Sequence, residues 1–198
     1  MRIGIDIDGV LTNLEQFVAD YFTKFCVEKN IDYKLGEIDY EPYKTFNVSK
    51  EQEEEFWLEY LEFYALNEKA RPFATDIIKK LKEDGHEIYV ITARWLTNRQ
   101  NAEGQKMREI VSNWLAESNI IYDKLIFSKA DKENKVQEIV ENNIDLMIED
   151  SPNNIKMLSK IVPIICYNAE YNKNCVGDNI YHCTSWFDIY KKIMEINK

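Results

Sequence analysis

The 198-residue chain has few of the residues that interrupt regular structure, with only six glycines and four prolines. Disordered and fibrous chains are rich in these residues, whereas hydrophobic residues make up 45% of this sequence. The composition is therefore that of a globular protein with a buried core. The length fits one large domain, or one core with a modest insertion.

Cysteine and long apolar runs are also scarce. The four cysteines are widely spaced and form no CxxC pair, which favours reduced thiols over a disulfide framework. The first eight residues include two acids and lack the apolar stretch of a signal peptide, and no later window suggests a membrane span. These absences predict a cytoplasmic protein without a membrane partner.

Positive charge is in deficit, because 25 Lys and Arg residues face 35 Asp and Glu residues, for a net charge of −10. Binding to a long nucleic acid depends on neutralising phosphates, so no such partner is expected. A small phosphorylated molecule is compatible with this charge, provided that a cation or a local positive cluster offsets the field at one site.

Short apolar runs alternate with helical patterns along most of the chain. The runs occupy residues 3–7, 87–91, 124–127, 144–148 and 162–166, and the residues after 168 suggest a short strand and a closing helix. This alternation is typical of βαβ units. It predicts an α/β fold with a Rossmann-like three-layer α/β/α core, in which helices cover both faces of a parallel sheet.

The alternation is interrupted between the first and second runs. Residues 13–71 contain no convincing buried strand, but two helix-like segments, roughly 13–29 and 49–66, and many aromatic residues. We expect a small helical cap at 13–71, inserted into a core made of 1–12 and 72–198. Most of the aromatic residues are expected to pack on one another, and a minority would face a substrate.

Asp6 and Asp8 are the strongest local chemical signal, at the end of the first predicted strand. Residues two apart share a face of an extended chain, so both carboxylates are expected in the crevice beyond the strand, where open α/β sheets bind ligands. Two nearby carboxylates repel each other, and a cation relieves the repulsion. Mg²⁺ suits them because it binds carboxylates together with a substrate phosphate. Taken alone, the pair could equally be solvated acids of a turn.

Polar residues also follow three other predicted strands. Thr92, Ala93 and Arg94 come at the end of the second strand, lysines follow the third, and Glu149 and Asp150 follow the fourth. Hydroxyl, guanidinium and ammonium groups suit phosphate oxygens, and a further carboxylate suits a cation. Because the carboxyl ends of parallel strands meet at one edge, these clusters are expected to form one site.

The ordered set of DIDGVLTN at 6–13, ITAR at 91–94, a lysine around 132 and IEDSPNN at 148–154 resembles the four motifs of the haloacid dehalogenase superfamily of phosphohydrolases. The helical insertion directly after the first motif and the TAR triplet resemble the 5′(3′)-deoxyribonucleotidase-like family. The resemblance implies a magnesium-dependent phosphomonoesterase whose partner is a small phosphorylated substrate, a nucleoside or deoxynucleoside monophosphate.

The resemblance also implies a role for each motif. Asp6 would attack phosphorus to give an aspartyl-phosphate, and Asp8 would protonate the leaving alkoxide and then activate water. Asp6, Asp150 and the backbone carbonyl of Asp8 would bind the metal. The insertion would close over the substrate and exclude water. The phosphoryl oxygens would be held by Thr92, Ala93, Arg94 and a lysine.

Two positions leave a choice open. Lys129, Lys132 and Lys135 crowd one turn after the third strand, and of these we favour Lys132 as the phosphate-binding lysine, with Lys135 second. Glu149 stands where the superfamily usually has Asp, so its support of the metal is expected to pass through water.

Three alternatives compete with the nucleotidase interpretation. A phosphatase of sugar phosphates or other small metabolites is the nearest, because the cap aromatics could pack only on one another. A phosphoacceptor signalling module is disfavoured, because such modules carry the phosphorylated Asp on a middle strand. A catalytically inactive binding protein is disfavoured by the presence of both Asp6 and Asp8.

Overall fold

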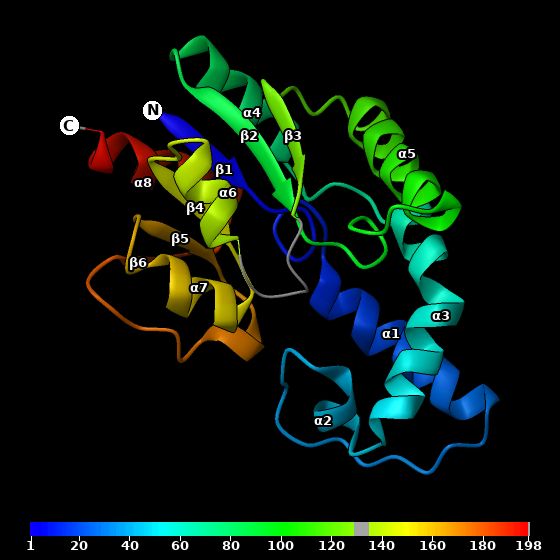
Figure 1. The fold of residues 1–198 in the computed structure, drawn as a ribbon. Helices are drawn as coiled ribbons and strands as arrows, with labels where there is room; N and C mark the ends of the chain where they lie inside the picture. The colour runs from blue at the N-terminus through cyan, green and yellow to red at the C-terminus, as the bar shows by residue number, and fades with distance from the viewer. Residues whose placement is uncertain (129–134, 198) are drawn as a thin grey trace.

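The structure, a computed structural model, describes residues 1–128 and 135–197. Within these residues, six parallel strands form one sheet in the order β3-β2-β1-β4-β5-β6 (Figure 1). The five strands expected from the apolar runs are present, and the tail supplies the sixth. The strands are β1 (Arg2–Ile5), β2 (Glu87–Thr92), β3 (Lys124–Phe127), β4 (Leu146–Glu149), β5 (Ile164–Tyr167) and β6 (Ile180–Cys183).

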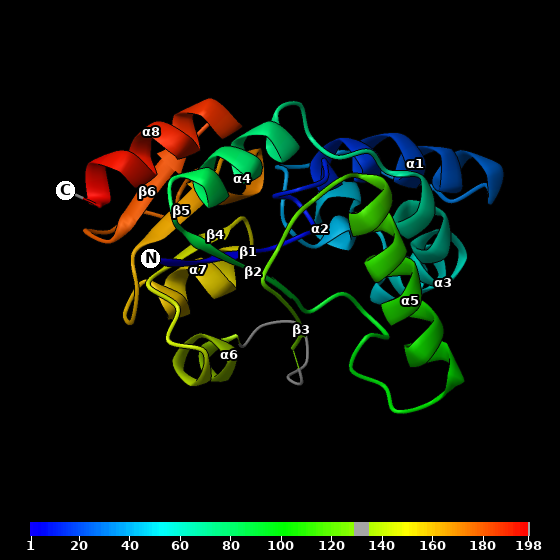
Figure 2. The same ribbon diagram turned by 90° about the horizontal axis from the view of Figure 1, so that it is seen from above.

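Helices cover both faces of the sheet, as predicted. Figure 2 shows α4 and α8 on one side and α6 and α7 on the other. The first pair shares its apolar core with α5, and the second pair packs in a separate cluster against the opposite face. These helices are α4 (Ala74–Glu83), α5 (Ala102–Glu117), α6 (Val136–Glu141), α7 (Pro152–Leu158) and α8 (Trp186–Ile196).

The central strand β1 shows how closely the layers pack. Ile3 and Ile5 point into the core beneath α4 and α8, and Gly4 faces the opposite side. A Cβ atom on Gly4 would lie 2.5 Å from Sδ of Met147, its register partner on β4. The glycine therefore makes room for the neighbouring strand's side chain in a core packed on both faces.

The segment between β1 and α4 forms α1 (Leu14–Glu28), α2 (Pro42–Phe46) and α3 (Lys50–Asn67). The two longer helices agree with the helix-like segments of the sequence, and polar side chains cap their first turns. Ser49 and Gln52 form a reciprocal capping box at the start of α3. The sequence did not indicate α2, because five residues are too few to show a helical period.

These helices enclose an aromatic core of their own. Phe56 of α3 lies at its centre, with ring centroids 4.7 Å from Phe22, 4.9 Å from Trp57 and 5.1 Å from Tyr60. A further apolar cluster joins α3 to α5. The aromatic residues of this segment are thus mainly packing residues, in agreement with the expectation from their helical spacing.

No helix in the described part of the chain combines the length and the apolar character needed to cross a bilayer.

The aromatic core predicts a contrast between two neighbours on α3. Phe56→Ala should lower the free energy of unfolding by about 3–5 kcal/mol, because Phe56 is fully buried and its loss leaves a cavity among packed rings. Leu58→Ala is the control, since Leu58 is 72% exposed and its loss should change stability by no more than about 0.5 kcal/mol. Urea unfolding curves measure both, and equal effects would contradict the packing described.

Candidate active site

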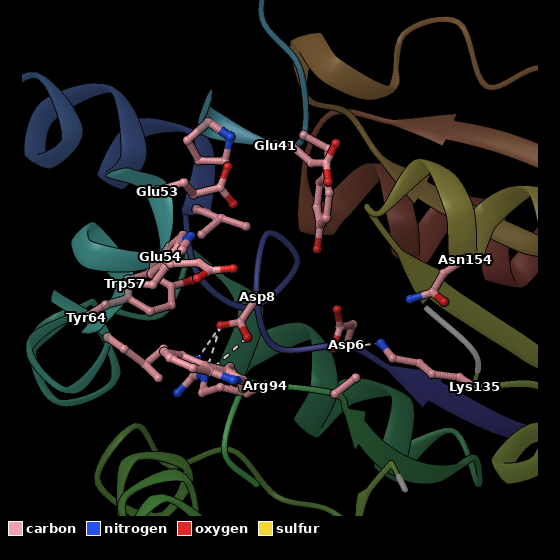
Figure 3. A pocket seen from close by; sticks show the side chains of 16 residues that line it. Asp6, Asp8, Glu41, Glu53, Glu54, Trp57, Tyr64, Arg94, Lys135 and Asn154 are labelled. Atoms are coloured by element: carbon pink, nitrogen blue, oxygen red, sulfur yellow. Dashed lines mark hydrogen bonds and ion pairs between the residues drawn. The ribbon is translucent and has the colours of Figure 1, made fainter. Parts of the chain in front are cut away.

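The predicted site residues lie where three adjacent strands end. Asp6 directly follows β1, Thr92 is the last residue of β2, and Glu149 is the last residue of β4. Because β1 lies between β2 and β4 in the sheet, their carboxyl ends bring these residues together. Figure 3 shows the side chains of the surrounding pocket.

The loop after β1 is tightly built. The backbone N–H of Asp6 donates to the carbonyl of Ile148 at 3.1 Å, which extends the sheet by one residue. Gly9 then takes a φ of 80°, a left-handed conformation that favours glycine. A Cβ atom on Gly9 would also lie only 1.8 Å from Oδ2 of Asp150. Glycine at this position thus allows the loop to approach the carboxylate that follows β4.

Three carboxylates converge below this loop. Oxygen atoms of Asp6, Glu149 and Asp150 all lie within 4.8 Å of one another, and all three residues are buried. Lys135, which is 1% exposed at its side chain, pairs with two of them. Its Nζ lies 2.8 Å from Oδ1 of Asp6 and 2.8 Å from Oε1 of Glu149. We call Asp6, Glu149 and Asp150 the acidic trio.

Glu149 is the fully bonded member of the acidic trio. Its Oε2 accepts the backbone N–H groups of Asp150 at 2.7 Å and Ser151 at 3.1 Å, and Asn154 donates to Oε1 at 2.6 Å. Burial alone would raise the pKa of Glu149, but Lys135 and these N–H donors outweigh it and lower the pKa. Glu149 is therefore an ionised anchor that connects Lys135 to the start of α7.

Asp150 is the under-bonded member. Tyr171 donates its hydroxyl to Oδ2, whereas Oδ1 is buried and has no hydrogen-bond partner among the described residues. Burial, followed by the charges of Glu149 and Asp6, holds the pKa of Asp150 well above its usual range. A buried carboxylate oxygen beside two other carboxylates fits the oxygen-ligand chemistry of Mg²⁺.

Asp6, like Asp150, has a raised pKa. Burial raises its pKa to about 8, Lys135 opposes this rise, and Glu149 and Asp8 add to it. One lysine thus does not fully compensate the acids gathered at this edge. The donor set fits a divalent cation as the missing charge.

Asp8 lies apart from the acidic trio. Its side chain turns to Arg94, whose Nε lies 3.2 and 3.1 Å from the two carboxylate oxygens and whose Nη2 also donates to Oδ1 (Figure 3). Thr92 is fully buried, and its Oγ1 accepts the backbone N–H of Arg94 at 3.2 Å. The structure therefore places both aspartates of the first motif at the site, but in different surroundings.

The candidate lysines differ in what can be said of them. Lys132, the favoured one, and Lys129 lie outside the described residues, whereas Lys135 is described and contacts the acidic trio. The sequence did not single out Asn154 or Tyr171. Tyr171 lies in the segment after β5, so extending the strand-end rule to that strand would have drawn attention to it.

A cavity of about 170 Å³ opens beside these groups, and two parts of the chain line it. The segment after β1 contributes Leu14, Tyr40, Glu41, Pro42, Glu53, Glu54, Trp57, Leu61 and Tyr64. The sheet side contributes Asp6, Asp8, Ala93, Arg94, Trp95, Lys135 and Asn154. Carboxylates and cations thus lie at the base of the cavity, and aromatic and acidic side chains of the insertion lie across from them.

Comparisons with known proteins agree with this geometry. The whole chain, residues 1–198, matches the family described as "5' nucleotidase, deoxy (Pyrimidine), cytosolic type C protein". A Bacillus subtilis (strain 168) protein named "Putative nucleotidase YqfW" is 29% identical, over 95% of this chain and 91% of its own length. A Chlorobaculum tepidum protein named "Putative 5'(3')-deoxyribonucleotidase" is 26% identical, over 96% of this chain and 89% of its own length.

The fold is also similar to that of known hydrolases. The crystal structure of a haloacid dehalogenase-like family hydrolase from Xanthomonas campestris superposes with a TM-score of 0.62 at 11% identity, covering 99% of this chain and 95% of that one. The fold class and the superfamily resemblance expected from the sequence are confirmed. The chain belongs to the 5′ nucleotidase, deoxy (pyrimidine), cytosolic type C protein family, and it is a phosphoric monoester hydrolase with the haloacid dehalogenase fold.

Proposed function

We propose that this protein is a magnesium-dependent phosphomonoesterase that hydrolyses nucleoside and deoxynucleoside monophosphates through an aspartyl-phosphate on Asp6. The observation that carries the proposal is the acidic trio, which Lys135 compensates only in part and in which Oδ1 of Asp150 has no partner among the described residues. Asp6, Asp150 and the backbone carbonyl of Asp8 would hold Mg²⁺. When bound, the ion would offset the charges of the carboxylates and of the phosphoryl oxygens.

Asp6 is the proposed nucleophile. One of its oxygens forms a bond to phosphorus while the bond from phosphorus to the ester oxygen of the substrate breaks. Asp8 gives its proton to that ester oxygen, so the nucleoside leaves as an alcohol. Asp8 then takes a proton from the water that attacks the phosphoaspartate, which releases inorganic phosphate and regenerates Asp6.

Groups around Asp6 would hold the phosphoryl oxygens. Thr92 already accepts an N–H at its hydroxyl oxygen, so its hydroxyl hydrogen is left to donate. We assign the lysine role to Lys135, because its ammonium group is paired with Asp6. The backbone N–H of Ala93, a residue that lines the cavity, would be a further donor.

Residues 13–71 are the proposed cap, and 1–12 with 72–198 the core that carries the chemistry. More than half of the residues that line the cavity belong to this insertion. The cap would exclude water from the phosphoryl group, and the rings of Tyr40 and Trp57 would offer a surface on which a base can stack. A sugar phosphate would fill the same cavity without using these rings, and such a phosphatase is the alternative.

A panel of phosphomonoesters tests the proposal. With Mg²⁺ present, we expect turnover of nucleoside or deoxynucleoside monophosphates to exceed that of sugar phosphates, and EDTA should abolish it. Asp6→Asn should reduce turnover by a factor of about 10³ or more, because an amide lacks the carboxylate oxygen that attacks phosphorus. Activity on sugar phosphates alone would contradict the nucleotidase assignment, and full activity of Asp6→Asn would contradict the nucleophile.

Trp57 should distinguish a base from a sugar. Trp57→Ala should raise KM for a nucleoside monophosphate by a factor of about 10, because stacking of one base on an aromatic ring stabilises binding by about 1–3 kcal/mol. The same variant should leave KM for glycerol phosphate nearly unchanged. Phe63→Ala on the same helix is the control, since Phe63 is partly exposed and does not line the cavity. Equal effects on both substrates would indicate a packing role for Trp57.

Lys135 should matter for stability as well as for turnover. In EDTA, Lys135→Met should lower the free energy of unfolding by about 3–5 kcal/mol, because it leaves buried carboxylates without their cation. Lys79→Met, at an exposed position of α4, should change it by no more than about 0.5 kcal/mol. We also expect Lys135→Ala to lose turnover and Lys132→Ala to keep it; the reverse result would return the phosphate-binding role to Lys132.

A further inference from the structure

The contact between Arg94 and Asp8 joins the ends of two strands. Asp8 lies in the loop after β1, and Arg94 follows β2. Nε of Arg94 lies 3.2 Å from Oδ1 and 3.1 Å from Oδ2 of Asp8, and Nη2 also donates to Oδ1. Two donors of one planar group therefore fix both the position and the orientation of the carboxylate.

The guanidinium of Arg94 is itself held in place. Its side chain is 2% exposed, and its carbon centre lies 5.2 Å from the centroid of the Tyr64 ring. The hydroxyl of Tyr64 lies 2.6 Å from Oγ1 of Thr12, which donates to the carbonyl of Ile7 at 3.1 Å. Tyr64 of α3, which belongs to the insertion, thus provides the surface on which the guanidinium of Arg94 packs.

The third nitrogen of Arg94, Nη1, takes no part in the contact with Asp8. Nη1 is buried and has no hydrogen-bond partner among the described residues, while Nε and Nη2 are occupied by Asp8. The side chain as a whole is only 2% exposed, so little of it is presented to a phosphoryl oxygen. Its contact with Asp8, by contrast, is made by two nitrogens at once.

We infer that Arg94 is a positioning residue, which holds the carboxylate of Asp8 in the orientation needed to give a proton to the leaving oxygen, and that it is not a ligand of the phosphate. The inference rests on the proposed function, which makes Asp8 the general acid. Asp8 is 19% exposed at its side chain, and the two-point contact with Arg94 restricts its rotation. Loss of orientation slows proton transfer without removing any group that binds substrate.

A series of aryl phosphates separates the two roles. Dinitrophenolate leaves without protonation, whereas phenolate and a nucleoside alkoxide need a proton. The ratio kcat/KM reports the steps up to departure of this group, so the later attack of water does not affect it. The variants are Arg94→Gln, Arg94→Lys and Asp8→Asn, with Arg99→Gln as the matched control, since Arg99 is an exposed arginine paired with Glu103.

With Mg²⁺ present, Arg94→Gln should lose about 10²-fold or more in kcat/KM for phenyl phosphate and nucleoside monophosphate, in line with the usual contribution of a general acid. It should lose less than about 3-fold for dinitrophenyl phosphate. The affinity for inorganic phosphate, measured by calorimetry, should stay within about 2-fold of the wild type. Arg99→Gln should match the wild type on every substrate.

A uniform loss across the series, together with weaker binding of inorganic phosphate, would overturn the inference and make Arg94 a phosphate ligand. If Arg94→Gln does not fold, Arg94→Lys carries the test, because it keeps the charge and loses the two-point contact. Asp8→Asn distinguishes failure of the role of Arg94 from failure of the acid role of Asp8. If it shows the dependence on the leaving group and the Arg94 variants do not, only the inference fails; if Asp8→Asn is itself uniform, the acid role of Asp8 fails as well.

Discussion

The ion pairs of Lys135 are the interaction on which the rest of the site depends. Three carboxylates cannot be buried within 4.8 Å of one another without a compensating charge, and the ammonium group of Lys135 contacts two of them. Glu149 accepts a hydrogen bond from this lysine and also accepts the backbone N–H groups of Asp150 and Ser151, which lead into α7. Lys135 directly precedes α6, so its ammonium group links the ends of β1 and β4 to the start of this helix.

The imbalance that remains has a chemical use. Structural ion pairs usually come close to neutrality, whereas this edge keeps Asp6 and Asp150 with pKa values raised by burial and by neighbouring acids. In the proposed function, such a site would attract a further cation, and through it an anionic substrate, to a protein with a net charge of −10. The acidity of the whole chain would otherwise repel a phosphate ester.

Much of the fold followed from periodicity. Short apolar runs with helical patterns between them were enough to predict a parallel sheet with both faces covered, since each pattern reflects a local backbone period. Asp6, Thr92 and Asp150 could be placed at strand ends from the sequence, because a strand end is a local feature of sequence. The contacts made across the site were harder to predict from the sequence. Arg94 and Asp8 are 86 residues apart, and Tyr171 and Asp150 are 21 residues apart, so no local pattern indicates that they meet. Lys135 could not be separated from its neighbours for the same reason.

Gly4, one of only six glycines, has an effect well beyond its own contacts. A Cβ atom at this position would lie 2.5 Å from Sδ of Met147, so a larger residue would force that side chain to move. Glycine therefore favours the alignment in which β1 and β4 pair without displacing Met147. That alignment places Ile5 beside Ile148, and hence Asp6 level with Glu149. A residue without a side chain thus helps to hold the strand pairing that sets how far apart two carboxylates lie.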